Sequence, residues 1–424
     1  MTSTGSFQSG TAAVLEPRTS PASPPVLILN MFYSGLGIAR QLAGKGMRVV
    51  GLSSQPSIYG NFTRLCEIRR APDSKDSPEQ LLEFLRNTDE FDGAVIFPTR
   101  DADVIFLDRH RSQLGRYCLS IPPAQCLRSA IDKYELARIA QHAGVPVPRT
   151  LAVRSAEELT RVPGEVGFPC VVKPISAYQW HVGDVWERVG CRKAFRVDNW
   201  NSLQSEYEQI AQVTPEVLIQ EWIHGPVDQI VILGGYVGDD SELLGYFTAR
   251  KILQFPEDCG TGCIVRSEPI DEIVETTAEL FRALQYQGMA EVEYKYDART
   301  REYKLIEINT RHWDQHQLAE ASSVNLSWIA YCHLTGKVIP RQHGPVAVAT
   351  WVAEDALFTK LIRSLVRPQL RTPHLLAKLS GPRMYGIFSA TDPVPFVRYF
   401  GGTVLPELTG KMFRGIRDSL RSRS

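Results

Sequence analysis

Short apolar runs and amphipathic stretches alternate along the N-terminal part of the chain. VLILN at 26–30 predicts a buried strand, SGLGIARQLAGKG at 34–46 a turn and a helix, and MRVVGLS at 47–53 a second buried strand. A further strand is predicted at Ala94–Phe97, where Pro98 ends it, and a helix is expected to begin near Asp101. This order of elements predicts an α/β fold that opens with a βαβ unit.

Two runs rich in β-branched and aromatic residues, at 291–297 and 303–309, predict a β-hairpin with a five-residue loop at 298–302. If the loop is symmetric, Glu293 lies opposite Glu307. Strand alternation then divides the side chains into an acidic face and an apolar face. The acidic face holds Glu291, Glu293, Glu307 and Asn309, and the apolar face holds Val292, Tyr294, Ile306 and Ile308.

Opposed carboxylates on a ladder repel each other, so this arrangement calls for a cation between them. Two carboxylates and an amide oxygen suit Mg²⁺, which keeps waters and phosphate oxygens as its other ligands. The alternative is a solvated strand face whose acids are neutralised by Lys295 and Lys304. The pattern alone leaves both interpretations open.

Several basic residues upstream stand where an anion would bind. Lys133 lies near the start of an amphipathic helix that Gly144 ends, and a cation there opposes the helix dipole unless an anion is close. Lys173 ends a short apolar strand, CVVK, just before a proline. Arg250 and Lys251 are adjacent on a predicted strand, so their side chains point to opposite faces.

Composition excludes several classes of partner. Lys plus Arg and Asp plus Glu number 47 each, so the chain has no long-range field that would collect a nucleic acid. Its eight cysteines show no zinc-type pairing, which is typical of a reduced, cytoplasmic protein. No run approaches the roughly 18 apolar residues of a transmembrane helix. Residues 1–25 are rich in Ser, Thr, Pro and Gly and are predicted to be a disordered tail.

The run IEINTR at 306–311, after a strand ending EYKYD, resembles the metal-binding hairpin of the ATP-grasp superfamily. The resemblance implies that Glu293, Glu307 and Asn309 hold Mg²⁺, or Mn²⁺ in its place, and that Arg311 acts at the reacting centre. It further implies that ATP is bound by residues in the order Lys133, Lys173, Gln220, Glu221, Trp222, Ile223 and Asp228. A basic residue at 250–251 would contact the transferred phosphate, with Lys251 favoured over Arg250.

The same resemblance, which runs from about Val26 to Lys337, implies a division of the chain. A Rossmann-like pre-ATP-grasp domain is expected at 26–122, a small lid-bearing subdomain at 123–219, a large subdomain with the metal hairpin at 220–337, and a C-terminal extension at 338–424. In relatives the first domain presses a loop on the substrate site, so Thr99, Arg100 and Asp101 are candidate substrate contacts. The lid departs from the family: Tyr178, Gln179, Trp180 and His181 stand where a glycine-rich loop is usual.

Among ATP-grasp proteins the chain looks most like carboxylate-amine ligases similar to D-aspartate ligase, and more distantly like the carbamoyl-phosphate-synthase branch. The resemblance implies small-molecule carboxylate and amine substrates joined through an acyl phosphate, with a homodimer as a candidate assembly. Three alternatives stay open: a carboxylase that phosphorylates bicarbonate, a non-catalytic ATP-binding protein, and a nicotinamide-dependent oxidoreductase. The oxidoreductase would depend on Gly35 and Gly37, which more simply indicate a tight turn before the first helix.

His312 and His316 are four residues apart and could share a zinc ion on a helix face. No third ligand follows at a known spacing. Local hydrogen bonding or substrate contact is therefore the favoured role for both histidines.

Overall fold

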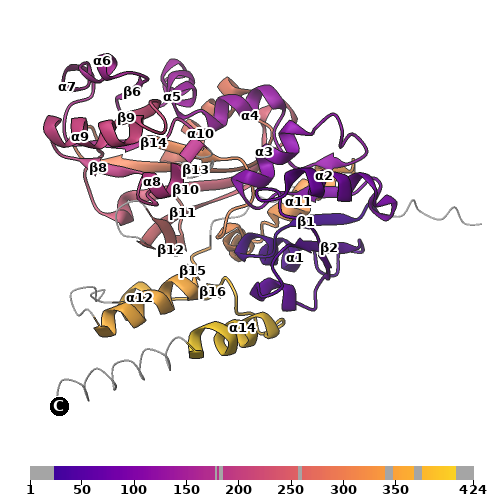
Figure 1. The fold of residues 1–424 in the computed structure, drawn as a ribbon. Helices are drawn as coiled ribbons and strands as arrows, with labels where there is room; N and C mark the ends of the chain where they lie inside the picture. Colours follow the sequence, from indigo (N-terminus) through magenta and orange to yellow (C-terminus); the bar gives the residue numbers. More distant parts are fainter. Residues whose placement is uncertain are drawn as a thin grey trace, which may run out of the picture.

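The computed structural model describes residues 23–176, 179–180, 185–255, 260–339, 347–366 and 375–406 (Figure 1). Most of the predicted N-terminal tail, residues 1–22, lies outside them. Its last residues, predicted to be disordered, are instead fixed: the Tyr331 hydroxyl donates to the Pro24 carbonyl at 2.8 Å, and the Val95 amide donates to the Pro25 carbonyl at 2.9 Å. They are ordered because they lead directly into the first strand.

A five-stranded parallel sheet forms the N-terminal domain, in the order β3-β2-β1-β4-β5. The α/β prediction and the Rossmann-like start are therefore confirmed. The strands are β1 (Val26–Leu29), β2 (Val49–Ser53), β3 (Glu67–Arg70), β4 (Val95–Phe97) and β5 (Cys118–Leu119). The helices are α1 (Tyr33–Leu42), α2 (Pro78–Arg86), α3 (Asp101–Arg109) and α4 (Ala124–Ile131), with a 3₁₀ turn η1 (Tyr59–Phe62) and another, η2 (Asp89–Phe91).

The two glycines of the first helix were predicted to form a turn, and this was wrong. Both Gly35 and Gly37 lie inside α1. A Cβ on Gly35 would come within 2.0 Å of the Asn30 carbonyl oxygen, and one on Gly37 within 2.6 Å of the His316 ring. The glycines permit close packing of the helix, because only a residue without a side chain fits at these contacts.

A seven-stranded sheet forms the centre of the molecule, in the order β14-β13-β10-β11-β12-β15-β16. Its strands are β10 (Ile230–Val237), β11 (Leu243–Phe255), β12 (Thr261–Ser267), β13 (Gly288–Asp297), β14 (Glu302–Asn309), β15 (Thr350–Val352) and β16 (Arg383–Tyr385). Other elements of this part are α10 (Glu272–Leu284), α11 (Leu326–Leu334), α12 (Glu354–Val366), α13 (Leu375–Lys378), α14 (Val394–Tyr399), η4 (Val227–Gln229), η5 (Asp239–Ser241), η6 (His316–Ser322) and η8 (Phe400–Val404). Two strands of the predicted C-terminal extension thus complete this sheet.

A separate four-stranded sheet, β6-β9-β7-β8, forms the part beside the hairpin (Figure 1). Its strands are β6 (Thr150–Val153), β7 (Cys170–Lys173), β8 (Phe195–Val197) and β9 (Val217–Glu221). The accompanying helices are α5 (Lys133–His142), α6 (Ala156–Leu159), α7 (Val162–Glu165), α8 (Val185–Arg188) and α9 (Trp200–Ala211). The predicted boundary at 219/220 falls within β9, and the domain limits otherwise stay predictions.

The hairpin register agrees with the prediction at its carboxyl end and differs near the turn. Glu293 pairs with Glu307 and Glu291 with Asn309, as expected. Beyond Glu293 the register slips by one residue, so Tyr294 pairs with Leu305 and the loop is 298–301. Leu305, and not the predicted Ile306, therefore enters the apolar core. The slip is a β-bulge, a feature that the alternation of residue types does not reveal.

The two faces of the central sheet have different neighbours. One face packs against α5 and α10 in an apolar cluster that includes Val292 and Tyr294. The opposite face packs against α1, α11 and the edge of the N-terminal domain in a second cluster. The acidic end of the hairpin belongs to this second face, so it lies next to the N-terminal domain. No helix in the described part of the chain is long and apolar enough to cross a membrane.

Candidate active site

Lysines from other elements lie against the acidic face of the hairpin. Lys251, on β11, places its Nζ 2.6 Å from Glu293 Oε1. Lys133, at the start of α5, places its Nζ 4.0 Å from Glu307 Oε2. The Asn309 amide donates to Glu291 Oε2 at 2.9 Å. Lys251, Glu291 and Glu293 are buried, so their charges interact strongly with their neighbours.

The carboxylates on this face respond to their surroundings in opposite ways. Burial, reinforced by the charge of Glu293, raises the pKa of Glu291 from 4.5 to about 8. Burial also acts to raise the pKa of Glu307, but the charges of Lys133, Lys173 and other lysines outweigh it and lower that pKa. Burial acts to lower the pKa of Lys251, but nearby carboxylates, Glu293 above all, raise it. The face therefore carries charged Glu307 and Lys251 beside a Glu291 that is protonated at neutral pH.

Arg311 lies just beyond the end of β14 and is fixed by the N-terminal domain. Its Nε donates to Asp101 Oδ1 at 2.7 Å, and its Nη1 donates to the His312 carbonyl at 3.2 Å. Burial acts to lower the pKa of Arg311, but Asp101 and Asp314 outweigh it and raise that pKa. A small cavity of about 40 Å³ is lined by Asp101, Lys133, Glu307 and Asn309, among others. The N-terminal domain and the hairpin thus form one site.

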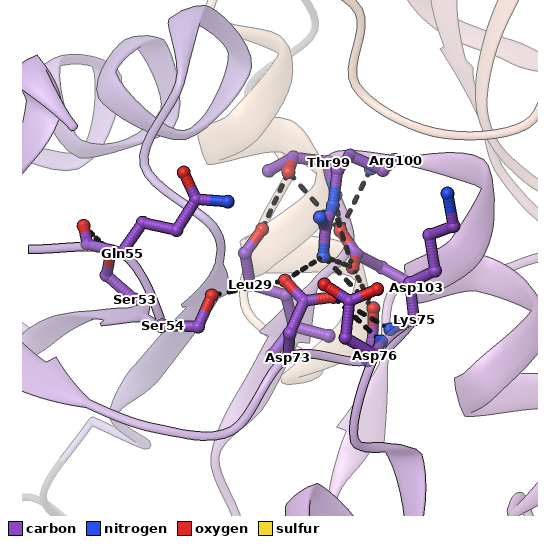
Figure 2. Close-up of polar contacts among 11 residues, drawn as sticks. Leu29, Ser53, Ser54, Gln55, Asp73, Lys75, Asp76, Thr99, Arg100 and Asp103 are labelled. Carbon is purple, nitrogen blue, oxygen red and sulfur yellow. Dashed lines mark hydrogen bonds and ion pairs between the residues drawn. The ribbon is translucent and has the colours of Figure 1, made fainter. Parts of the chain in front are cut away.

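The other candidate substrate contacts of the N-terminal domain are held within it (Figure 2). The Thr99 hydroxyl donates to the Leu29 carbonyl at 2.6 Å. The Arg100 Nη2 donates to Asp73 Oδ2 at 3.0 Å and to Asp103 Oδ1 at 2.8 Å. These bonds join the carboxyl ends of the parallel strands. Only Asp101 of the three candidates reaches the hairpin.

Lys173 is buried at the end of β7, where its Nζ donates to Gln220 Oε1 at 2.7 Å. The Gln220 amide donates in turn to the Thr150 hydroxyl at 2.9 Å. The lysine therefore aligns the side chain at the end of β9, and its charge contributes to lowering the pKa of Glu307. Thr150 was not a sequence candidate, and only the pairing of β6 with β9 places it here.

The segment at 220–223, called the hinge below, joins the small sheet to the large one. Glu221 lies 2.8 Å from Arg299 Nη2 and 3.4 Å from Lys304 Nζ, and both cations also contact Asp297. Trp222 has the Arg196 guanidinium 5.1 Å and the Lys295 ammonium 5.3 Å from its ring centroid, while Ile223 is buried. Sequence reasoning gave Lys304 only a neutralising role on the acidic face, whereas it lies in this cluster beside the hinge.

Arg250 and Asp228 meet each other away from the acidic face. The Arg250 Nη1 donates to the Asp228 carbonyl at 2.7 Å, and its Nε donates to Glu268 Oε1 at 2.5 Å. The Asp228 side chain is exposed. Alternation on β11 thus places Lys251 at the carboxylates and Arg250 near the segment that follows the hinge.

The histidines after the hairpin have local partners. His312 Nε2 lies 3.0 Å from Ser327 Oγ, and His316 Nδ1 lies 2.7 Å from the Trp313 carbonyl. Their rings pack edge to face with centroids 4.8 Å apart. Burial lowers the pKa of His312 well below its usual range and that of His316 to about 4. Both are core residues in neutral form, which agrees with the expected hydrogen-bonding role.

Comparison with known proteins gives this geometry a context. Residues 263–326 match a family described as the carbamoyl-phosphate synthase L chain, ATP binding domain. The chain is 28% identical over 201 residues to a D-alanine–D-alanine ligase of Pseudomonas entomophila, which covers 46% of this chain and 59% of that protein. It is 24% identical over 255 residues to a D-aspartate ligase of Enterococcus faecium, covering 57% and 59%. The matches thus span about three fifths of each relative's length.

Solved structures extend the likeness to the fold. A biotin carboxylase complex from Campylobacter jejuni aligns with a TM-score of 0.59 and 20% identity, covering 75% of this chain and 72% of that one. An L-amino acid ligase from Bacillus licheniformis aligns with a TM-score of 0.56 and 16% identity, covering 77% and 78%. The chain has the ATP-grasp fold. The small sheet, the central sheet and the N-terminal parallel sheet are the parts of this fold that surround the site.

The segment that was predicted to form the lid is only partly described. Tyr178 and His181, two of the four residues that stand where a glycine-rich loop is usual, lie outside the described residues. The Gln179 amide donates to the Thr214 hydroxyl at 3.0 Å, and Trp180 is buried against Phe195 with ring centroids 6.3 Å apart. These two residues therefore pack within the small subdomain.

Proposed function

We propose that this ATP-grasp protein is an ATP- and Mg²⁺-dependent carboxylate-amine ligase that joins its substrates through an acyl phosphate. The observation that carries the proposal is the meeting of Glu293, Glu307, Lys251, Lys133 and Arg311 at one site. Binding of a nucleotide alone does not require an arginine fixed beside the acidic face. The ligase names of the relatives support the same reading.

The donor set on the hairpin fits a hard divalent cation. Glu293 and Glu307 supply carboxylate oxygens directly opposite each other, and Asn309, whose nitrogen donates to Glu291, keeps its amide oxygen for a cation. No cage of three His, Cys, Asp or Glu side chains occurs among the described residues. A partial set agrees with Mg²⁺ or Mn²⁺ that takes its remaining ligands from water and phosphate. When bound, the metal would neutralise charge on the phosphates during phosphoryl transfer.

The ATP site would run from the hairpin to the hinge. Lys133 and Lys173 would contact the phosphates, because both already place positive charge near Glu307. The backbone of Gln220–Ile223 would bind the adenine edge, and Asp228 the ribose hydroxyls. Arg250 lies beside Asp228, so we assign it to the nucleotide end of the site and Lys251 to the transferred phosphate.

The reaction would proceed in two displacements. An oxygen of the substrate carboxylate attacks the γ-phosphorus of ATP, and the bond to ADP breaks to give an acyl phosphate. The nitrogen of the amine then attacks the acyl carbon, loses a proton, and expels inorganic phosphate. Arg311, held by Asp101, would stabilise the acyl phosphate and the oxyanion that forms on attack.

The oxidoreductase alternative loses its basis in this structure. A dinucleotide fingerprint needs glycines that let the pyrophosphate approach the backbone. Here Gly35 and Gly37 are buried in α1, and the space beside them is filled by the Asn30 carbonyl and by His316 and Gln317. A carboxylase and a non-catalytic ATP-binding protein are separated from a ligase by experiment.

The test is phosphate release from Mg-ATP, screened against pairs of amino acids and against bicarbonate. A ligase releases phosphate only when a carboxylate and an amine are both present, and the coupled product appears in equal amount. Release with bicarbonate alone would indicate a carboxylase. ATP binding without release under any condition would indicate a non-catalytic protein and would contradict the proposal. Glu307→Gln serves as the inactive control.

A further inference from the structure

The segment 311–314, which follows β14, contacts the N-terminal domain at two helices. The Arg311 guanidinium donates to Asp101, the first residue of α3. The hydroxyl of Ser34, the second residue of α1, donates to Asp314 Oδ1 at 3.1 Å. The segment therefore lies against the starts of both helices.

These two helices begin where other open parallel sheets bind their ligands. α1 follows β1, α3 follows β4, and the two strands are neighbours in the sheet. β2 lies on the far side of β1 and β5 on the far side of β4, so the strand order reverses between β1 and β4. In open α/β sheets, ligands bind outside the carboxyl ends of the strands at such a reversal. The segment 311–314 lies at this point.

Arg311 and Asp314 are the residues of this segment that a ligand can reach. In the run 311–319 both are half-buried, whereas every other residue is buried. Three residues of chain span at most about 11 Å, so the two Cα atoms are no farther apart than that. The charge of each side chain also affects the pKa of the other. A group held at Asp314 would therefore lie beside a group held at Arg311.

Asp314 is the carboxylate beside Arg311 that is left for a ligand. Asp101 accepts from the Arg311 guanidinium, and Glu291 accepts from the side-chain amide at the end of β14. Asp314 accepts from Ser34 at Oδ1, and no group among the residues that the structure describes donates to its Oδ2. A carboxylate oxygen in this position can accept a hydrogen bond from an ammonium group.

The surroundings of Asp314 make it a stronger base than an ordinary aspartate. The charged and titratable groups around it are Arg311, Lys193 in the segment before β8, Asp355 of α12 and Tyr59 of η1. Burial raises the pKa of Asp314, and the Asp355 charge adds to the rise. The two cations and the Ser34 hydrogen bond oppose the rise without cancelling it. Tyr59 stays neutral, because burial above all raises the pKa of its hydroxyl.

We infer that Asp314 binds the substrate amine as an ammonium and acts as the base that frees its lone pair, an inference that rests on the proposed ligase function. Asp314 Oδ2 takes one proton from the ammonium, and the nitrogen attacks the acyl carbon. As the carbon–nitrogen bond forms, the carbon–oxygen bond to the phosphate breaks. A second proton from the nitrogen leaves with the phosphate, as HPO₄²⁻, and Asp314 then releases its own proton to water.

The test replaces the amine with hydroxylamine, which separates the formation of the acyl phosphate from the activation of the amine. Hydroxylamine is uncharged at neutral pH, so it needs no base before it attacks an acyl phosphate. L- and D-amino acids are supplied one at a time as the carboxylate, with Mg-ATP, and the hydroxamate is measured as its iron complex. Coupling of the same carboxylates to the amine of a second amino acid is measured by mass spectrometry.

Asp314→Asn keeps an acceptor for Ser34 but can no longer take a proton. Hydroxamate formation should stay within about 3-fold of the unmodified chain, while coupling to an amino-acid amine at neutral pH falls roughly 10²-fold or more. The loss should shrink as the pH rises, because each pH unit below the pKa of the amine increases its uncharged share about tenfold. A purely structural role would lower both rates alike at every pH.

Two further variants are the controls. Ser34→Ala removes the hydrogen bond from α1 and keeps the carboxylate, so coupling should fall far less than in Asp314→Asn. Asp108→Asn, on α3, removes a carboxylate that accepts from Arg111 at 2.8 Å within the N-terminal domain. This variant should couple amines as the unmodified chain does.

The outcomes separate this inference from the proposed function. If Asp314→Asn couples amines normally, loses both reactions alike, or is matched by Ser34→Ala, then Asp314 is not the base. Those results leave the proposed function intact when the unmodified chain forms a hydroxamate. If the unmodified chain forms neither a hydroxamate nor a coupled product with any of these amino acids, the proposed function is contradicted and the role of Asp314 falls with it.

Discussion

Glu291→Gln should stabilise the metal-free protein, and the gain should grow with pH. Glu291 is buried on the acidic face, where burial and Glu293 raise its pKa from 4.5 to about 8. Gln at this position keeps an oxygen that can accept the Asn309 amide, now at 2.9 Å, so the hydrogen bond survives. What disappears is the cost of forming or avoiding a buried charge.

The direction in which Glu291 changes stability with pH follows from the protons bound by the folded and unfolded chains. Below pH 4.5 the carboxyl is protonated in both, so it adds no pH dependence. Between pH 4.5 and about 8 the unfolded chain releases the proton while the folded chain keeps it, so the folded state loses stability as pH rises. At about 1.4 kcal/mol per pH unit, this loss reaches about 3 kcal/mol at pH 7. The Gln variant does not lose this stability, because a glutamine side chain carries no titrating proton.

The assay is urea unfolding of both proteins at pH 5, 6, 7 and 8 in the presence of a chelator, followed by tryptophan fluorescence. The difference in unfolding free energy should rise steadily from pH 5 to pH 8. Glu302→Gln, at an exposed position on the same hairpin, is the matched control for removal of a carboxylate. A pH-independent difference for Glu291→Gln would refute the assignment of a raised pKa to this residue.

The remaining predictions concern the roles of individual basic residues. Lys173→Ala should raise the Kd for ATP, measured by calorimetry, more than it lowers apo stability. Equal ATP affinity in the variant would leave Lys173 with a structural role, such as its bond to Gln220. Arg311→Lys keeps the charge but loses the forked geometry, so turnover should fall by roughly 10²-fold with ATP affinity nearly preserved; a parallel loss of both would move Arg311 to the nucleotide site. Lys251→Met removes the ammonium that lies 2.6 Å from Glu293 and should lower the unfolding free energy of the apo protein by about 3–5 kcal/mol in urea unfolding. A loss below about 1 kcal/mol would mean that the ion pair is solvated.

The parts of this molecule that could be read from its sequence are those fixed by local patterns. The assumption of a symmetric loop predicted the pairing of Glu293 with Glu307, which is confirmed, and Gly144 in a left-handed conformation follows the helix that begins at Lys133. Both depend on residues close together in the chain. The acidic face was therefore predictable, including Glu291 and Asn309.

The contacts that complete the site could not be read in this way. Asp101 and Arg311 are 210 residues apart in sequence, and only the packing of the N-terminal domain on the hairpin joins them. The bulge after Glu293 places Leu305 in the apolar core instead of Ile306. A register slip of one residue leaves no signature in the residue types, so the sequence could not predict it. Ser34 and Asp314 are likewise 280 residues apart, and tertiary structure alone joins them.

The central claim is that a substrate carboxylate is phosphorylated at this site, and isotope transfer tests it most directly. The pair of substrates that supports phosphate release is supplied with ¹⁸O in both carboxylate oxygens, and the released phosphate is examined by mass spectrometry. The account predicts one ¹⁸O atom per phosphate with the unmodified chain and no release with Glu307→Gln. Phosphate that carries oxygen from water alone would mean simple ATP hydrolysis and would contradict the account.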